Sequence, residues 1–296
     1  MVDSIGISLP DAYMPSDRLS GLRPLDWEGS YFGTFGGLRI TQGRKGVYIR
    51  GSLPKYLKGE NALPLDRQGF RESLRKLEAE SGLDLKAGMV YQLETGCTLP
   101  VNEPPREYLA SWGPLPRFKK NSFGNGETVM LTNRGRSFSG YDKGDEMAPD
   151  TMPCLFEGSY ALRLELRWKS GIRRLYGRIL SPWEASEPEP YGQAIEAWAD
   201  FYFKIPKRRE VCLAMDGMTP SRFKETLAAF GLQSLGLDPA ESIIRDGQAY
   251  GALNRRNASR IRRDLRELAR NERISDTGRL TAEIDEKVRA VARGVS

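Results

Sequence analysis

The segment 161–168 (ALRLELRW) places charged side chains where they could act on a phosphate group. Its residues alternate in polarity as in a β-strand, so Arg163, Glu165 and Arg167 share one face and the leucines share the other. A carboxylate between two guanidinium groups could bind a metal ion beside two phosphate contacts. The same alternation is typical of a salt-bridged sheet surface, and this segment alone is compatible with both interpretations.

A second segment, 136–146 (RSFSGYDKGDE), brings a phenol close to a cation. On a strand, Tyr141 and Lys143 share a face, and Asp142 and Glu146 add acidic groups nearby. A free phenol has a pKa of about 10 and is a poor nucleophile at neutral pH. A neighbouring cation or metal ion lowers that pKa and stabilises charge on an attacked phosphate, so Tyr141 is a candidate nucleophile. The alternative is a half-exposed tyrosine of an ordinary strand.

Two further segments offer an acid and two cations. In 89–97 (MVYQLETGC), Glu94 precedes a Thr-Gly pair, and we expect it at the end of a strand, as a metal ligand or as a solvated carboxylate. In 47–61 (VYIRGSLPKYLKGEN), a strand is followed by a Gly-Ser pair and then by Lys55 and Lys58. This spacing predicts a turn that contacts the phosphates of DNA, or a basic surface turn, but it lacks the spacing of a P-loop.

The composition excludes several kinds of active site. The chain has 296 residues and no histidine, so it can form no Ser-His-Asp triad, Cys-His pair or two-histidine metal site. Its three cysteines, Cys97, Cys154 and Cys212, lie far apart without zinc-type spacing, which is typical of reduced cysteines in the cytoplasm. Carboxylates are then the main candidate metal ligands, which favours Mg²⁺ or Mn²⁺ over Zn²⁺.

The positive charge is concentrated near the carboxyl end. The chain carries a formal net charge of +6, and residues 250–296 contain eleven arginines and one lysine against seven acidic residues. Ile261, Leu265 and Leu268 recur at helical spacing, so 252–273 predicts a helix with one apolar stripe. The rest of its surface suits contact with a nucleic-acid backbone, although a solvated surface helix gives the same pattern. The candidate DNA-contacting residues here are Arg255, Arg256, Arg262, Arg263 and Arg266.

The first two thirds of the chain predict an α+β fold, an antiparallel sheet with helices packed on one face. Apolar spacing predicts a helix over 65–81, and a shorter one is expected from Pro104 to Trp112. The expected strands cover 5–9, 38–41, 46–50, 89–93, 128–132, 136–142 and 161–168.

A change in composition separates a second part of the chain. Residues 180–191 (LSPWEASEPEPY) are polar and proline-rich, and we expect them to be a connection. We therefore expect a first domain over 1–205 and a basic, all-α part over 206–296. No apolar run reaches the roughly 20 residues of a membrane span, so we expect no membrane partner and a cytoplasmic location. Helices are expected at 192–204, 219–231, 238–250, 252–273 and 279–294.

Taken in order, these segments resemble the filamentous-phage gene II/X replication-initiation proteins and their plasmid relatives, which are rolling-circle initiators without a His-hydrophobic-His motif. The resemblance covers about residues 1–205, including an opening strand that ends at Pro10. Its elements are KYLKGEN at 55–61, YDK at 141–143 with a trailing Glu146, and RLELR at 163–167. The family's second element usually carries Asp after Arg. Here that element reads QLE at 92–94, so the acid is Glu94, whose side chain is longer by a methylene group.

This resemblance implies a metal-dependent DNA nicking and joining enzyme that starts rolling-circle replication of a phage or a related element. Tyr141 would attack an origin phosphodiester and form a 5′-phosphotyrosine. Lys143, Arg163 and Arg167 would stabilise the charge on the phosphate. The expected ligands of Mg²⁺ or Mn²⁺ are Glu94 and Glu165, with Asp142 or Glu146 as further ligands.

The expected partners are the single- and double-stranded DNA of the replication origin and the host replication machinery, with a helicase among its components. The alternative is a non-catalytic origin-binding protein or repressor, which would shift DNA on a native gel without a covalent adduct. An RNA-binding protein has less support, because no aromatic-rich strand of the RNP type stands out.

Overall fold

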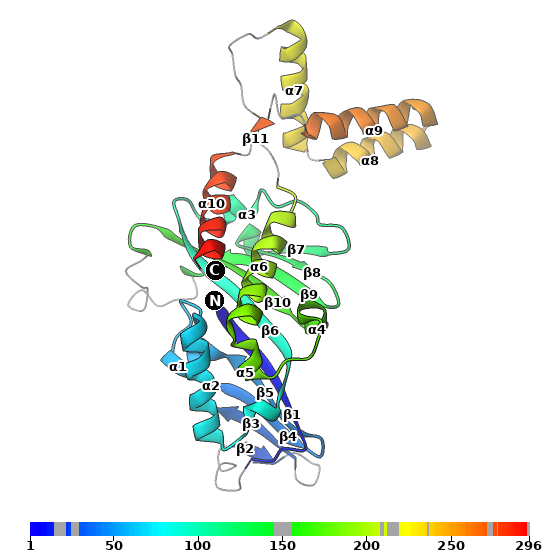
Figure 1. The fold of residues 1–296 in the computed structure, drawn as a ribbon. Coiled ribbons are helices and arrows are strands. Elements are labelled where there is room, and N and C mark those ends of the chain that lie inside the picture. The colour runs from blue at the N-terminus through cyan, green and yellow to red at the C-terminus, as the bar shows by residue number, and fades with distance from the viewer. Residues whose placement is uncertain are drawn as a thin grey trace. The chain divides into compact units, whose positions relative to one another are not determined.

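In the computed structural model the chain forms an α+β fold, as the sequence predicted (Figure 1). Strands form most of the first part of the chain, with a few helices between them, and helices dominate after residue 182. The structure describes residues 1–14, 22–24, 30–144, 156–207, 210–211, 219–235, 237–270, 275–276 and 278–294.

Within these residues, ten strands form one sheet in which every neighbouring pair is antiparallel. The first strand of the chain lies in the middle of the sheet and joins two groups of strands that are far apart in sequence. In spatial order the strands are β2 (Leu22–Pro24), β3 (Tyr31–Phe35), β4 (Leu38–Gly43), β5 (Gly46–Ser52), β1 (Val2–Pro10), β6 (Met89–Val101), β10 (Tyr160–Trp168), β9 (Arg136–Asp142), β8 (Thr128–Thr132) and β7 (Lys119–Phe123).

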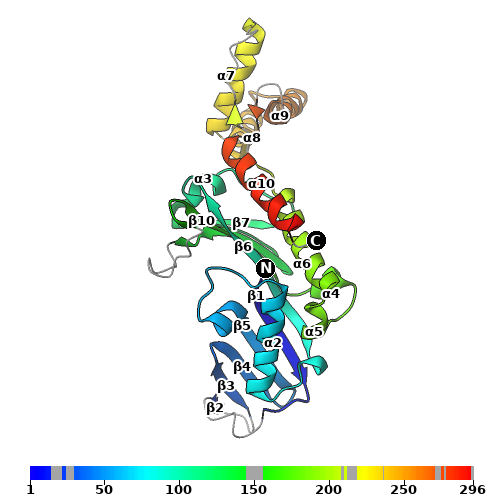
Figure 2. The same cartoon turned by 60° about the vertical axis from the view of Figure 1, so that its left-hand side comes forward.

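The alternation of side chains gives the sheet one apolar face, which lies against helices (Figures 1 and 2). Ile5 and Ile7 of β1 and Leu164 of β10 are fully buried on this face. The indole of Trp198, on helix α6 (Pro188–Lys204), donates a hydrogen bond to the carbonyl oxygen of Leu164 at 3.1 Å. We call the opposite side of the sheet, away from α6, the open face.

Every strand expected from the sequence is present, but their number and lengths differ from the expectation. Strand β6 continues to Val101, so Glu94 lies inside a strand and not at its end. Strands β2, β3 and β7 were not predicted, because their short polar or glycine-containing segments show little alternation. Residues after Ser52 form helix α1 (Leu53–Lys58) where a turn was expected.

The predicted connection at 180–191 is wrong, because most of it is helical. Helix α5 (Pro182–Ala185) begins at a capping box formed by Ser181 and Glu184. Prolines occupy the first positions of α5 and α6, where the missing N–H costs no helical hydrogen bond, so they start helices here and do not break them. The other helices of this part are α2 (Arg67–Ser81), α3 (Pro105–Leu109) and α4 (Ile172–Tyr176).

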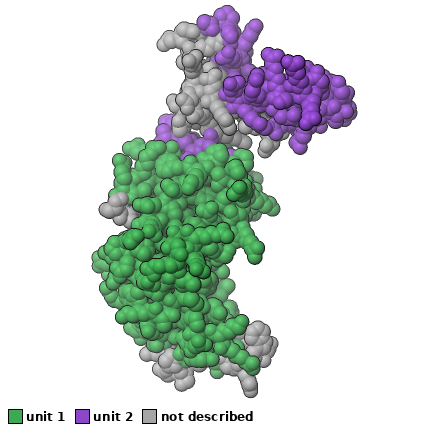
Figure 3. All heavy atoms as spheres, turned by 45° about the vertical axis from the view of Figure 1, so that its right-hand side comes forward, with its two compact units in different colours: residues 1–110, 114–206, 283–296 green, residues 111–113, 207–282 purple. Residues whose placement is uncertain are grey.

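The chain divides into two compact units, and the division differs from the predicted boundary (Figure 3). Unit 1 comprises residues 1–110, 114–206 and 283–296, and unit 2 comprises 111–113 and 207–282. The change at residue 206 lies close to the boundary expected at 205, but the end of helix α10 (Arg279–Arg293) belongs to unit 1. Its Asp285 accepts a hydrogen bond from the phenol of Tyr202 at 2.8 Å.

Unit 2 is mainly helical. Arg266 of α9 (Arg255–Arg270) pairs with Glu241 of α8 (Leu237–Ala249) at 3.0 Å. A short strand pair, β11 (Glu210–Val211) with β12 (Ser275–Asp276), means that this part is not purely α-helical as predicted. Among the described helices of both units, none combines the length and the apolar character needed to cross a bilayer. The helices of unit 2 are α7 (Pro220–Leu235), α8 (Leu237–Ala249) and α9 (Arg255–Arg270).

Candidate metal and nucleophile site

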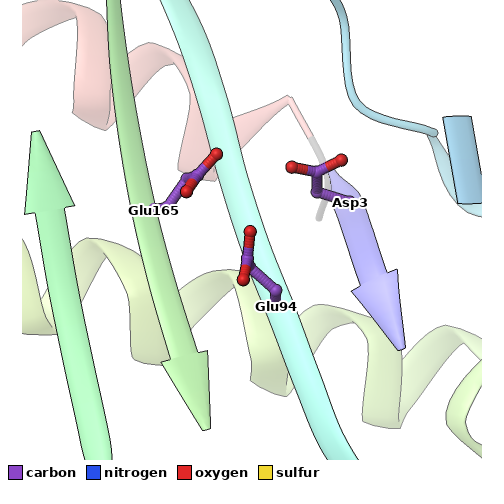
Figure 4. Close-up of side chains that lie close together, drawn as sticks. All are labelled: Asp3, Glu94 and Glu165. Atoms are coloured by element: carbon purple, nitrogen blue, oxygen red, sulfur yellow. The ribbon is translucent and has the colours of Figure 1, made fainter. Parts of the chain in front are cut away.

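Three carboxylates from neighbouring strands converge on the open face (Figure 4). Asp3 lies on β1, Glu94 on β6 and Glu165 on β10, and one oxygen from each lies within 4.8 Å of the other two. Only 4%, 3% and 7% of these residues, respectively, is exposed to solvent. We call this group the acidic cluster. It contains two of the four predicted metal ligands and one residue that was not predicted.

Asp3 reaches the cluster because β1 has an irregular register. Val2 pairs with Thr95 and Ser4 pairs with Glu94, so Asp3 is an extra residue in β1 with no partner of its own in β6. Such a β-bulge redirects side chains and is common beside functional sites. The hydroxyl of Ser52, the residue that caps α1, donates a hydrogen bond to Oδ1 of Asp3 at 3.1 Å. The sequence signal for Asp3 was an acid inside an apolar strand, which goes against the usual exposure of Asp.

Arg163 connects the cluster and is completely buried. Its Nη2 donates to Oδ2 of Asp3 at 2.7 Å and its Nε donates to Oε1 of Glu165 at 3.0 Å. Its Nη1 donates to Oγ1 of Thr98 at 2.9 Å. Burial alone would lower the pKa of Arg163, but the adjacent Asp3 and Glu165 carboxylates raise it above its usual value. The structure thus corrects the prediction of a phosphate contact, because this guanidinium is buried and orients two carboxylates.

Glu94 forms the third corner of the cluster and pairs with Arg167. Burial, together with the neighbouring Glu165 carboxylate, raises the pKa of Glu94 to about 7, although Arg167 acts in the opposite direction. The side chain of Arg167 is 38% exposed, so one side of this guanidinium is accessible to a phosphate. The alternative of a solvated carboxylate at residue 94 is therefore wrong.

Tyr141 joins the cluster from the next strand. Its register partner on β10 is Arg163, and its hydroxyl donates a hydrogen bond to Oε1 of Glu165 at 2.7 Å. The ammonium of Lys143 lies 5.9 Å from the centre of the Tyr141 ring and is buried. The sequence predicted that these side chains share a face, and the structure brings a phenol, a carboxylate and a cation together on that face.

The loop that follows α1 lies against the cluster on the open face and explains its burial. Thr98 donates a hydrogen bond to the carbonyl oxygen of Ala62 at 2.7 Å, and Lys143 donates one to Oδ1 of Asn61 at 3.3 Å. The KYLKGEN segment therefore contributes through its last residue, Asn61. Lys55 and Lys58 of α1 are exposed, as a contact to DNA would require.

A close contact between strands requires glycine beside the cluster. Gly96 of β6 pairs with Glu165 of β10. A Cβ atom at Gly96 would lie 2.7 Å from the carbonyl oxygen of Leu164 and 3.0 Å from Cγ of Glu165. Any larger residue would push β10 or the Glu165 side chain away.

The remaining predicted residues lie elsewhere. Asp142 is not part of the acidic cluster of the described chain; it pairs with Leu162, whose side chain belongs to the apolar face, and its Oδ1 accepts a hydrogen bond from the N–H of Gly144. Glu146 lies outside the described residues.

The predicted DNA-contacting arginines lie in unit 2. Three of them contact polar or acidic side chains: Arg262 donates to Gln248, Arg263 contacts Asp264 and Arg266 pairs with Glu241. The exposed residues Arg255, Arg256 and Arg263 line a surface groove on α9.

The donor set of the acidic cluster fits a hard divalent cation. Carboxylate oxygens are the ligands that Mg²⁺ and Mn²⁺ prefer. Glu165 uses Oε1 to accept from both Tyr141 and Arg163, so its Oε2 remains for a ligand.

No protein-family model matches the chain, and no curated protein matches its sequence.

Proposed function

We propose that this protein is a metal-dependent DNA nicking and joining enzyme that starts rolling-circle replication, with Tyr141 as the nucleophile. The observation that carries this proposal is the 2.7 Å hydrogen bond from the Tyr141 hydroxyl to Glu165, one of three clustered carboxylates. A phenol that donates to a carboxylate beside a cation site is arranged as a nucleophile with its base.

These contacts support the following reaction. Oε1 of Glu165 accepts the phenolic proton as Oη of Tyr141 forms a bond to the phosphorus of an origin phosphodiester. The bond from phosphorus to the 3′ oxygen breaks, that oxygen takes up a proton, and a 3′-OH is released. The 5′ phosphate stays on Tyr141, and attack by a 3′-OH on this phosphotyrosine reverses the step and joins the strand. The bond energy is retained throughout, so no ATP is consumed.

The other residues of the site bind and orient. Asp3, Glu94 and Glu165 would hold Mg²⁺ or Mn²⁺, which polarises a phosphate oxygen when bound. The buried Lys143 stabilises negative charge on the tyrosine oxygen, and the half-exposed Arg167 contacts the phosphate. Arg163 keeps two of the carboxylates in place.

Binding of the origin requires contacts outside the site. Lys55 and Lys58 beside the site and the arginines of α9 would contact the DNA backbone, which positions the protein without reading bases. The released 3′-OH would prime synthesis by the replication machinery of the bacterial host, in its cytoplasm, with a helicase to separate the strands.

A covalent adduct tests the proposal. The full chain is incubated with Mn²⁺ and a random-sequence pool of single-stranded oligonucleotides that carry fluorescein at the 3′ end. Cleavage with a 5′-phosphotyrosine leaves the label on the protein, so the wild type gives a fluorescent band on a denaturing gel. We expect Tyr141→Phe to lose this band entirely, and EDTA to abolish it.

Tyr160→Phe is the matched control, because Tyr160 lies at the start of β10 and is 45% exposed. It should form the adduct as the wild type does. An adduct formed at the wild-type rate by Tyr141→Phe would show that another residue is the nucleophile. A 5′-labelled pool should give no labelled protein, which fixes the polarity of the linkage.

Origin binding without cleavage is a second candidate function. It is favoured by the ion pairs of Arg163 and Arg167, which stabilise the buried carboxylates without a metal ion. It predicts that the wild-type protein shifts DNA on a native gel but gives no adduct in the denaturing assay.

A further inference from the structure

A second group of side chains on the open face comes from strands β3, β4, β5 and β6. The alternation of β4 and β5 buries one set of side chains and exposes the other. Phe32, Arg39, Tyr48 and Arg50 are exposed on these strands, and Tyr91 of β6 is half-buried beside them. We call these five residues the aromatic–arginine patch. They take no part in the acidic cluster.

The strand register makes the patch continuous. Phe32 pairs with Thr41, and Thr41 pairs in turn with Tyr48, which places both aromatic rings in one row across β3, β4 and β5. Arg39 pairs with Arg50 in the next row. Residues that are paired across neighbouring antiparallel strands point to the same face of the sheet, so rings and guanidiniums alternate over one surface.

The aromatic rings are accessible to solvent and contact neighbouring side chains of the patch. Phe32 is 40% exposed and Tyr48 is 38% exposed. The rings of Tyr48 and Tyr91 meet edge to face with centroids 6.4 Å apart, and the guanidinium carbon of Arg39 lies 6.0 Å from the centroid of Phe32. Exposed apolar rings gathered in one place often mark an interaction surface, whereas single exposed rings are common.

The charges of the patch call for an anionic partner. Among the described residues, no ion pair involves Arg39 or Arg50, although they face each other on adjacent strands. Two like charges in register are unfavourable and are stabilised by bound anions. A surface groove beside them is lined by Tyr48 and Tyr91 and by two further cations, Lys169 and Arg173.

The patch also lies in line with the acidic cluster. Ser52, which contacts Asp3, and Tyr48 are both on β5 and four residues apart, which corresponds to about 13 Å along the strand. Arg50 lies between them on the same face. At 3.4 Å per stacked nucleotide, this distance corresponds to about four nucleotides, and to fewer in an extended strand.

We propose that the aromatic–arginine patch binds single-stranded DNA next to the phosphate that is cut, with bases stacked on Tyr48, Tyr91 and Phe32 and phosphates on Arg39 and Arg50. This inference rests on the proposed function for the identity of the nucleic acid. Exposed rings between cations form the usual surface for unpaired bases, because each base offers a flat face to an aromatic ring. In a duplex those faces are already covered by neighbouring base pairs, so the patch selects single strands.

Binding without cleavage tests this site. The affinity of the full chain for fluorescein-labelled oligothymidylate is measured by fluorescence anisotropy in EDTA, with excess unlabelled duplex present to occupy any duplex-binding surface. Tyr48→Ala should weaken binding at least about fivefold, which is the lower end for loss of one stacked base, whereas Tyr48→Phe should retain it. Arg39→Ala with Arg50→Ala should lower the slope of log affinity against log salt by about 1.4.

Matched controls come from the helices. Phe203 of α6 is 39% exposed, and Arg75 of α2 is exposed and has no ion pair among the described residues. Phe203→Ala and Arg75→Ala should both bind as the wild type does. Equal loss in the controls and the patch variants would overturn the proposal, as would retained affinity in Tyr48→Ala, a preference for single-stranded RNA of the same length, or binding that excess duplex abolishes.

The binding test of the aromatic–arginine patch and the adduct test of the proposed function can fail independently of each other. Tyr141→Phe should bind oligothymidylate with wild-type affinity, because Tyr141 is not part of the patch. Patch variants that lose binding while the wild type forms no covalent adduct would leave the single-strand site in place and remove the nicking activity. An adduct formed by the wild type, together with unchanged binding in the patch variants, would support the nicking activity and overturn the single-strand site.

Discussion

At the scale of single residues, the site depends on how three buried carboxylates are compensated. Removing carboxylates from water is costly unless cations and hydrogen bonds replace the water. Arg163 provides three donors, to Asp3, Glu165 and Thr98, and Arg167 pairs with Glu94. The burial of Arg163 makes it a positioning residue. Its loss would leave Asp3 and Glu165 without their shared cation.

Glu94 gives the metal-free protein a pH-dependent stability. Its pKa is raised from the usual value of 4.5 to about 7, so the folded state keeps a proton that the unfolded state releases in this range. The stabilisation from this group is complete below pH 4.5 and is lost as the pH rises through 7. We expect the free energy of unfolding in EDTA to fall across this window by at most about 3 kcal/mol relative to Glu94→Gln, which does not titrate.

Urea unfolding at several pH values checks this expectation. The wild type and Glu94→Gln are compared at each pH, so that all other titrating groups cancel to first order. A wild type that becomes more stable relative to the variant as the pH rises would contradict it, and would mean that the ion pair with Arg167 dominates.

Much of the site was predictable at this scale. Residue type and strand alternation made Glu94, Glu165 and Tyr141 candidates beside ordinary structural interpretations, and the family resemblance favoured the functional ones. Asp3 was missed and Arg163 was given the wrong role, because both depend on contacts between β1, β6 and β10. Burial of a guanidinium is set by the strands and loops that cover it, and no local pattern reports that.

At the scale of elements, irregular features of the strands place the chemical groups. The bulge in β1 directs Asp3 towards Glu94 and Glu165, and Gly96 lets β6 and β10 approach where Glu165 emerges. Bulges and close contacts arise from strand pairing, so a single strand's sequence does not predict them. Helix α5 and the first turn of α6 were missed for a local reason, since their prolines sit at helix starts and were taken for a connection.

Gly96→Ala should disturb the acidic cluster although it adds only one methyl group. The added methyl group would lie 2.7 Å from the carbonyl oxygen of Leu164, so β10 must shift and move Glu165 with it. We expect loss of at least about 1 kcal/mol of stability, as for overpacking of a close contact, and weaker binding of Mn²⁺. Thermal unfolding measures the first, and titration of Mn²⁺ by isothermal calorimetry measures the second.

Gly192→Ala provides the matched substitution. Gly192 lies in α6 with nothing near the position of its missing Cβ, so alanine should leave metal binding unchanged and stabilise the helix by about 0.5–1 kcal/mol. Equal effects of the two substitutions on Mn²⁺ binding would show that the contact at Gly96 does not position the cluster.

At the scale of the whole molecule, the chain leaves unit 1 after residue 206 and returns to it at residue 283. The returning helix α10 buries Ile284 and Val288, and its Glu283 accepts a hydrogen bond from the hydroxyl of Tyr108 at 2.6 Å. Charge and helical periodicity predicted the helices of the second part, but which of them belongs to unit 1 depends on tertiary contacts that periodicity does not record. The predicted first domain was therefore incomplete.

A chain ending at residue 206 should be less stable than the full chain. It lacks α10, so the surface covered by Ile284 and Val288 becomes exposed. Burial of two such side chains contributes on the order of 3–6 kcal/mol. Urea unfolding followed by tryptophan fluorescence compares the two proteins. Ile284→Ala in the full chain should show part of the loss, while Ile243→Ala, at a 60% exposed position, should change stability by less than about 0.5 kcal/mol.

The strand order determines when the acidic cluster can form during synthesis of the chain. Residues 3, 94 and 165 meet only when β1 has paired with β6 and β6 with β10, and these pairings span more than half of the chain. Long-range pairings form late, and a growing chain offers its residues in order. A ribosome-bound chain that has not yet exposed β10 therefore lacks Glu165. Under the proposed function, the chain cannot cut DNA before β10 has left the ribosome, and pairing of β10 with β6 completes the site.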